Sequence, residues 1–151
     1  QKQCTCTPLQ IKKYMGRVSS PLLDRIDLHI EVPRVPYQEM ASKVEAETSA
    51  EIRERVQAAR KLQEKRFRKS GISCNAHMNR RQVKEFCILT EDAAFLLQEA
   101  YQKLALSARA HDRILKVART ISDLAEEDKI DILPLAEAIN YRSLDRKDRF
   151  E

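Results

Sequence analysis

Residues 20–28 read Ser-Pro-Leu-Leu-Asp-Arg-Ile-Asp-Leu, and they lead directly into a stretch of alternating polar and apolar residues over 26–32. The alternation has the period of a half-buried β-strand, and prolines at 33 and 36 end it. A single strand cannot form a sheet. Its partner strands are therefore either missing from this chain or supplied by another one. We expect residues 1–36 to be the C-terminal end of a larger domain, with Arg25 fixed at the mouth of the strand.

A helix is predicted before this strand. Thr7 is a good N-cap, Pro8 is tolerated in the first helical turn, and Gly16 ends the segment. Ser19, Ser20 and the following proline form a second turn-and-cap signal. Residues 1–36 are thus predicted to hold the last helix, a turn that carries Arg25, and the last strand of that domain.

From about residue 37 the sequence predicts only helices. A long helix is expected over 49–69 and a short one over 80–86, and further helices follow the cap residues Thr90, Ser107 and Asp131. The long helix is expected to pack through an apolar stripe of Ile52, Val56, Ala59 and Phe67. The predicted fold class is therefore mainly α, with a helical domain over 37–142 and a charged tail over 143–151.

Composition excludes several classes of protein. Aromatic residues make up 5% of the 151 residues and there are only two glycines, which argues against all-β folds with their glycine-rich turns. No apolar run approaches the roughly 18 residues that a membrane span needs, and no signal-peptide pattern is present. The four cysteines show no disulfide framework, so we expect a reduced, cytoplasmic protein.

Positive charge is concentrated in residues 53–69, which contain eight Lys or Arg and two Glu, a net charge of +6. Such a helix can bind the phosphate backbone of nucleic acid, or it can be a solvated face with local ion pairs. The candidate nucleic-acid ligands are Arg60, Lys61, Lys65, Arg66, Arg68 and Lys69.

Two arginines are candidates for contact with phosphate. Arg109 follows the Ser107 cap by two residues, where a cation opposes the helix dipole unless an anion binds at that end. The alternative for Arg109 is a nearby carboxylate. Arg25 lies between Asp24 and Asp27, so it is either a functional cation or part of a structural ion pair.

The sequence shows no complete catalytic or metal site. Cys4 and Cys6 are two potential zinc ligands where about four are needed, and Cys74 with His77 lacks a second pair. No G-x-x-x-x-G-K-[ST] motif for nucleotide phosphates is present. We expect this chain to have no catalytic activity on its own.

The motifs of the chain resemble one family over nearly its whole length. They are Cys-x-Cys-x-Pro-Leu-Gln-Ile-x-x-Tyr at 4–14, Ser-x-Pro-Leu-Leu-Asp-Arg-Ile-Asp-Leu at 19–28, a 19-residue motif at 106–124 that begins Leu-Ser-Ala-Arg-Ala, and Ala-Ile-x-Tyr-Arg at 138–142. In this order they closely resemble the C-terminal part of the ComM/YifB proteins, the magnesium-chelatase-like branch of the AAA+ ATPases. One departure is Ser20, where the family usually has glycine, which reaches positive φ more easily.

The resemblance implies an ATPase whose Walker motifs lie upstream of this chain. The fold would be the end of an AAA+ core followed by a helical lid, in a homo-oligomeric ring, typically a hexamer, that uses ATP and Mg²⁺. Arg25 would be the arginine finger that reaches the neighbouring subunit's ATP, and Arg109 would be the sensor 2 arginine on ATP phosphate. Cys4 and Cys6 would be half of a four-cysteine zinc cluster.

The resemblance also implies an action on DNA, namely helicase and branch-migration activity during DNA uptake in natural transformation. One alternative is a chelatase-type motor subunit that remodels a protein partner. Another is a standalone helical module that binds DNA or protein.

Overall fold

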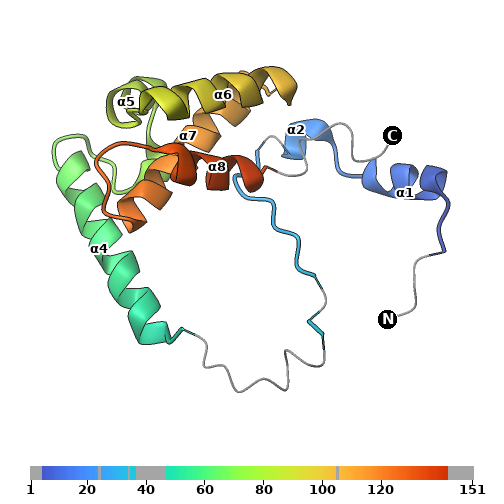
Figure 1. Cartoon of the computed structure of the whole chain (residues 1–151), viewed down its shortest axis with the longest axis horizontal. Coiled ribbons are helices and arrows are strands. Elements are labelled where there is room, and N and C mark those ends of the chain that lie inside the picture. Colours follow the sequence, from blue (N-terminus) through green and yellow to red (C-terminus); the bar gives the residue numbers. More distant parts are fainter. Residues whose placement is uncertain (1–4, 24, 34, 37–46, 105, 143–151) are drawn as a thin grey trace.

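The computed structural model describes residues 5–23, 25–33, 35–36, 47–104 and 106–142, and within them the chain is mainly helical (Figure 1). This confirms the predicted fold class. The described helices are α1 (Pro8–Met15), α2 (Ser20–Leu23), α4 (Ser49–Phe67), the 3₁₀ turn η1 (Asn75–His77), α5 (Arg80–Phe86), α6 (Glu91–Lys103), α7 (Ala108–Leu124) and α8 (Ile132–Asn140).

Most helices begin where a side chain can satisfy free backbone N–H groups. Thr7, Thr48 and Asn79 each form a capping box with the residue three positions later, at the starts of α1, α4 and α5. Thr90 and Ser107 accept hydrogen bonds from the backbone of α6 and α7, as predicted.

Asp131 is the N-cap of α8 but makes no capping bond with its side chain. Its carboxylate accepts a hydrogen bond from the Thr90 hydroxyl at 2.9 Å instead. The backbone pairs here as well, because Thr90 N donates to Ile130 O and Ile130 N donates to Ile88 O. The starts of α6 and α8 are therefore joined.

The core is built around α7, which packs against α4, α5 and α8. α5 to α8 lie together in Figure 1, whereas α4 leads away from them. Residues from all of these helices, among them Phe67, Val83, Leu97, Ile114 and Leu135, are buried in one cluster.

Only the C-terminal half of α4 joins this core. Ala59, Gln63 and Phe67 are buried, but Ile52 and Val56 are 42% and 43% exposed. The apolar stripe predicted along the whole helix is therefore wrong for its first half. This end of α4 leads away from the other helices (Figure 1), and both side chains stay partly exposed.

The stretch 26–32 is extended rather than part of a sheet. Among the described residues it makes a single isolated bridge, between His29 and Arg142, and His29 N donates to Tyr141 O at 2.6 Å. A strand needs neighbours along its length, and the described part of this chain supplies none beyond that bridge. The predicted tail over 143–151 lies outside the described residues.

Candidate functional site

Arg25 lies in the turn that follows α2. Its backbone N–H donates to Leu22 O at 2.9 Å, and its guanidinium donates to Pro21 O at 2.8 Å. The side chain is otherwise exposed and makes no ion pair with any residue that the structure describes. Asp27, one of its two predicted partners, pairs with Arg113 of α7, and Asp24 lies outside the described residues.

Arg109 is the second residue of α7, just after the Ser107 cap, whose hydroxyl accepts from Ala110 N at 3.1 Å. The side chain is exposed, and neither a hydrogen bond nor an ion pair joins it to a described residue. The structure therefore shows no described carboxylate that would hold Arg109. A cation in the first turn of a helix opposes the helix dipole, so its placement would become favourable with an anion bound there.

Two grooves meet at Arg109. The first, of about 820 Å³, lies between α7 and residues 27–30, and the second, of about 720 Å³, lies between α5, α6 and α7. The charged residues of the first are Asp27, Arg109, Asp112, Arg113, Lys116 and Glu137. Those of the second are Arg80, Lys84, Arg109 and Asp112, together with His111.

The first groove is balanced in charge, and most of its charged groups already have partners. Arg113 pairs with Asp27, Lys116 Nζ donates to Ala76 O at 3.0 Å, and Glu137 accepts from the Tyr141 hydroxyl at 2.9 Å. This groove therefore offers little net positive charge to a bound anion.

The second groove carries three cations against one carboxylate, and we call it the cationic groove. The carboxylate, Asp112, lies 3.1 Å from His111 Nδ1. The side chains of Arg80, Lys84 and Arg109 make no hydrogen bond or ion pair with the described residues. Unpaired cations over an apolar floor are suited to a small organic anion, and the volume lies in the range of ligand pockets.

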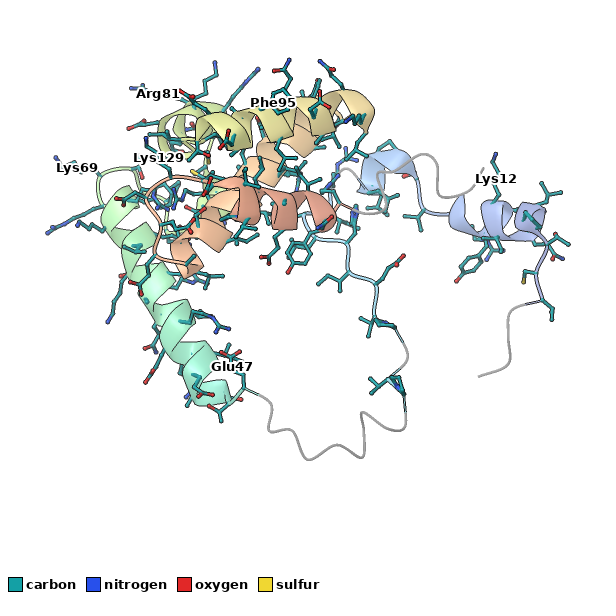
Figure 2. The ribbon with its side chains drawn as sticks, viewed as in Figure 1. Lys12, Glu47, Lys69, Arg81, Phe95 and Lys129 are labelled. Atoms are coloured by element: carbon teal, nitrogen blue, oxygen red, sulfur yellow. The ribbon has the colours of Figure 1, made fainter. Side chains whose placement is uncertain are left out.

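The basic residues of α4 and the turn after it differ in their surroundings. Lys61, Lys65 and Arg68 follow one another at helical spacing on the face opposite the buried Gln63 and Phe67. Arg60 and Lys69 are exposed too, and Figure 2 shows Lys69 pointing away from the helices. We call Arg60, Lys61, Lys65, Arg68 and Lys69 the basic face.

Arg66 does not belong to the basic face. Its guanidinium donates to both carboxylate oxygens of Asp123, at 2.7 and 2.5 Å, and to Asn75 Oδ1 at 2.9 Å. Its side chain is 16% exposed. An arginine held this way is not available to a phosphate, so its inclusion among the nucleic-acid ligands is corrected.

Asp123 is the centre of a buried network that the sequence analysis missed. Besides Arg66, it accepts from Asn75 Nδ2 at 2.8 Å and from Arg119 Nε at 3.1 Å. Arg119 also donates to the carbonyls of Glu127 and Asp128. The available signal in the sequence was that Arg119 and Asp123 lie four residues apart on the apolar side of a predicted helix, which indicates a buried ion pair.

The described residues provide few candidate ligands for a metal ion. Cys4 lies outside the described residues, Cys6 is exposed, and the described residues contain no cluster of three or more groups that could bind a metal ion. Cys74 Sγ lies 3.5 Å from His77 Nδ1. Cys87 is buried, and this burial raises the pKa of its thiol to about 12, so it is a neutral core residue at physiological pH.

Where the chain is described, none of its helices is both long enough and apolar enough to cross a lipid bilayer.

Comparison with known proteins finds two family models that match adjoining parts of the chain. Residues 46–142 match "Magnesium chelatase, subunit ChlI C-terminal", and residues 1–40 match "Magnesium chelatase, subunit ChlI".

Among curated proteins, the chain is 44% identical over 141 residues to competence protein ComM of Haemophilus influenzae. It is 43% identical over 143 residues to the uncharacterized protein YifB of Escherichia coli, and 42% identical over 144 residues to YifB of Salmonella typhimurium. Each match covers 93% of this chain but only 27% of the relative, so the chain spans about a quarter of the length of these proteins.

Proposed function

Because this chain belongs to the magnesium chelatase ChlI family, and with it to the AAA+ proteins, we propose that it is the arginine-finger segment and lid of a ring-forming ATPase. Residues 1–36 would complete the AAA+ core, residues 37–142 would form the lid, and 143–151 would be a tail. The ring would be a homo-oligomer, typically a hexamer, working in the cytoplasm.

The observation that carries this proposal is the unpaired Arg109 beside the cationic groove. A lid arginine of this kind would act as sensor 2 and contact ATP phosphate, and Arg80 and Lys84 add positive charge on the same side. Charge-assisted hydrogen bonds to phosphate are among the stronger ones that a protein can make.

Arg25 would act as the arginine finger. Its side chain is exposed and pairs with no described carboxylate, and its backbone is held by the turn after α2. A neighbouring subunit's ATP would take the place of Pro21 O as the partner of the guanidinium. Such an arginine stabilises the charge that develops on the transferred phosphoryl group, an effect worth about 10³–10⁵ in rate.

The described residues contain no cluster that could bind the Mg²⁺ or Zn²⁺ of the assembly. Mg²⁺ would arrive with ATP on the side of the Walker motifs, and we assign it no ligand in this chain. A zinc site at Cys4 and Cys6 has no support in the described structure.

We further propose that the motor acts on DNA, as a helicase or branch-migration enzyme in DNA uptake and recombination. The basic face supports a phosphate-backbone partner, and one relative carries the name competence protein. The alternative is a chelatase-type motor that remodels a protein, which the name of the matching family favours.

The test is the ATPase rate of the full-length parent protein with and without branched or single-stranded DNA. Stimulation by DNA would support the DNA motor. Hydrolysis that is indifferent to DNA would favour the chelatase-type motor, and no hydrolysis under any condition would contradict the ATPase itself.

A further inference from the structure

Residues 26–29, directly after Arg25, are attached to the helical domain at three points. Asp27 forms an ion pair with Arg113 of α7. Ile26 O accepts a hydrogen bond from the guanidinium of Arg142, which is buried, and His29 N donates to Tyr141 O. α7 and the end of α8 therefore both hold this short stretch.

The peptide groups of Ile26 connect these contacts to the turn that carries Arg25. Ile26 N donates to Leu23 O at 3.0 Å, within the turn, while Ile26 O is bound by Arg142. Only one residue separates Arg25 from Asp27. The backbone thus has little freedom between the Arg25 turn and the surface of the helical domain.

Arg113 lies one helical turn after Arg109 on the same face of α7, because residues four apart on a helix lie one above the other. In the Asp27–Arg113 pair, Asp27 lies two residues after Arg25 and Arg113 lies four residues after Arg109. Arg25 and Arg109, the two arginines that would contact phosphate in the proposed function, are thus linked through the Asp27–Arg113 ion pair.

We propose that Asp27 and Arg113 are positioning residues that fix the direction of Arg25 relative to the helix that carries Arg109. The inference rests on the proposed function of the two arginines. The Asp27 and Arg113 side chains are themselves 51% and 30% exposed. An ion pair this exposed adds little to stability, so its main effect is to fix geometry.

The ion pair acts on the rate of hydrolysis rather than on nucleotide affinity. An arginine finger is needed in the transition state, where misplacement by about 1 Å can cost up to a hundredfold in rate. In the proposed function, ground-state binding of ATP relies on the P-loop side of the site together with Arg109 and the cationic groove, and it does not require the finger. Loss of the pair therefore lowers kcat and leaves the affinity for ATP unchanged.

The experiment uses the full-length parent protein with four variants: Asp27→Asn, Arg113→Ala, the exchange Asp27→Arg with Arg113→Asp, and Arg25→Ala as the reference. Glu99→Gln is the matched control, because it removes another exposed ion pair, with Lys103 on α6, that has no link to residues 25–29. Each protein is measured for kcat, for affinity towards a non-hydrolysable ATP analogue, and for thermal midpoint.

Asp27→Asn and Arg113→Ala should each lower kcat by about ten- to a hundredfold with unchanged affinity and midpoint. The exchange should restore kcat to within about threefold of the parent value, as a double-mutant cycle requires of a direct pair. The Glu99→Gln control should match the parent protein.

The inference would be overturned if Asp27→Asn and Arg113→Ala both kept the kcat of the parent protein. It would also be overturned if the exchange variant had a kcat as low as theirs. If Arg25→Ala lowers kcat while the Asp27 and Arg113 variants do not, only this inference fails. If Arg25→Ala itself hydrolyses ATP normally, the proposed finger role fails instead.

Discussion

Arg66 and Asp123, 57 residues apart in sequence, form a two-pronged ion pair that joins the end of α4 to α7. Asp123 is fully buried and lies between two guanidinium groups, those of Arg66 and Arg119. This pair fixes the direction in which α4 leaves the core.

Replacing Asp123 should destabilise the fold strongly. Asp123→Ala leaves the buried guanidinium of Arg119 and the partly buried one of Arg66 without their carboxylate. Breaking a buried pair in this way costs about 3–5 kcal/mol. Urea denaturation of the chain, followed by circular dichroism, measures the loss. Arg55→Ala, on α4 like Arg66, is the control, because the ion pair of Arg55 with Glu47 is exposed and should contribute little. Equal midpoints for both variants would contradict a structural role for the buried pair.

Arg25 and Arg109 should fail in different ways. In the full-length protein, Arg25→Ala should lower ATP turnover by about 10³-fold or more while sparing ATP binding, because the finger acts on the transition state. Arg109→Ala should weaken nucleotide binding, turnover or both. Steady-state kinetics with equilibrium binding of an ATP analogue separates the two. Unchanged affinity and turnover in Arg109→Ala would remove it from the nucleotide site.

The cationic groove predicts two further contributors to nucleotide binding. The double substitution Arg80→Ala with Lys84→Ala should weaken binding of an ATP analogue by about tenfold or more, as expected for lost charge-assisted hydrogen bonds. Arg81→Ala is the matched control, because Arg81 lies on the same helix, is exposed (Figure 2) and does not line the groove. Equal affinity for the two proteins would place the phosphates elsewhere.

The basic face predicts salt-dependent DNA binding. Alanine at Lys61, Lys65 and Arg68 should weaken binding uniformly across DNA sequences and reduce the salt slope by about one unit per lost phosphate contact. Fluorescence anisotropy at several salt concentrations gives that slope. Alanine at Lys12 and Lys13 of α1 removes exposed charge elsewhere and should leave the slope unchanged. The same slope in both variants would exclude the basic face from the DNA site.

Cys87 should be inert in the folded protein. Its pKa is raised from 9.0 to about 12 by burial, so the native state keeps the proton that the unfolded state releases. The thiol therefore favours folding below pH 9, and this contribution is lost as pH rises from about 9 towards 12. At pH 8, iodoacetamide should label Cys74 and spare Cys87, as mass spectrometry can show. Rapid native labelling of Cys87 would contradict this assignment.

The helix boundaries were predictable because their signals are local. Thr7, Thr90 and Ser107 mark helix starts with the residues directly around them, and the structure agrees at each. The pairing of Arg66 was not predictable in the same way, since its partner lies far away in sequence. A basic helix face and a buried cation look alike until the packing is known.

The first half of α4 shows that burial, too, is hard to predict from sequence periodicity alone. Ile52 and Val56 have the spacing of a packed stripe, but burial depends on how far the neighbouring helix extends. The stretch 26–32 likewise has strand periodicity, yet pairing requires neighbours that the described residues lack. The resemblance to a family, by contrast, rested on long ordered motifs and agrees with the family models.

Because α4 is packed along only half its length, backbone amide exchange with deuterium should change sharply along one continuous helix. Amides near Ile52 and Val56 need only local fraying to exchange, whereas those near Gln63 and Phe67 are held by the core and should exchange only when the domain opens. Lys61, Lys65 and Arg68 lie on the slow half. Their charges are therefore presented by backbone that stays ordered as long as the domain is folded.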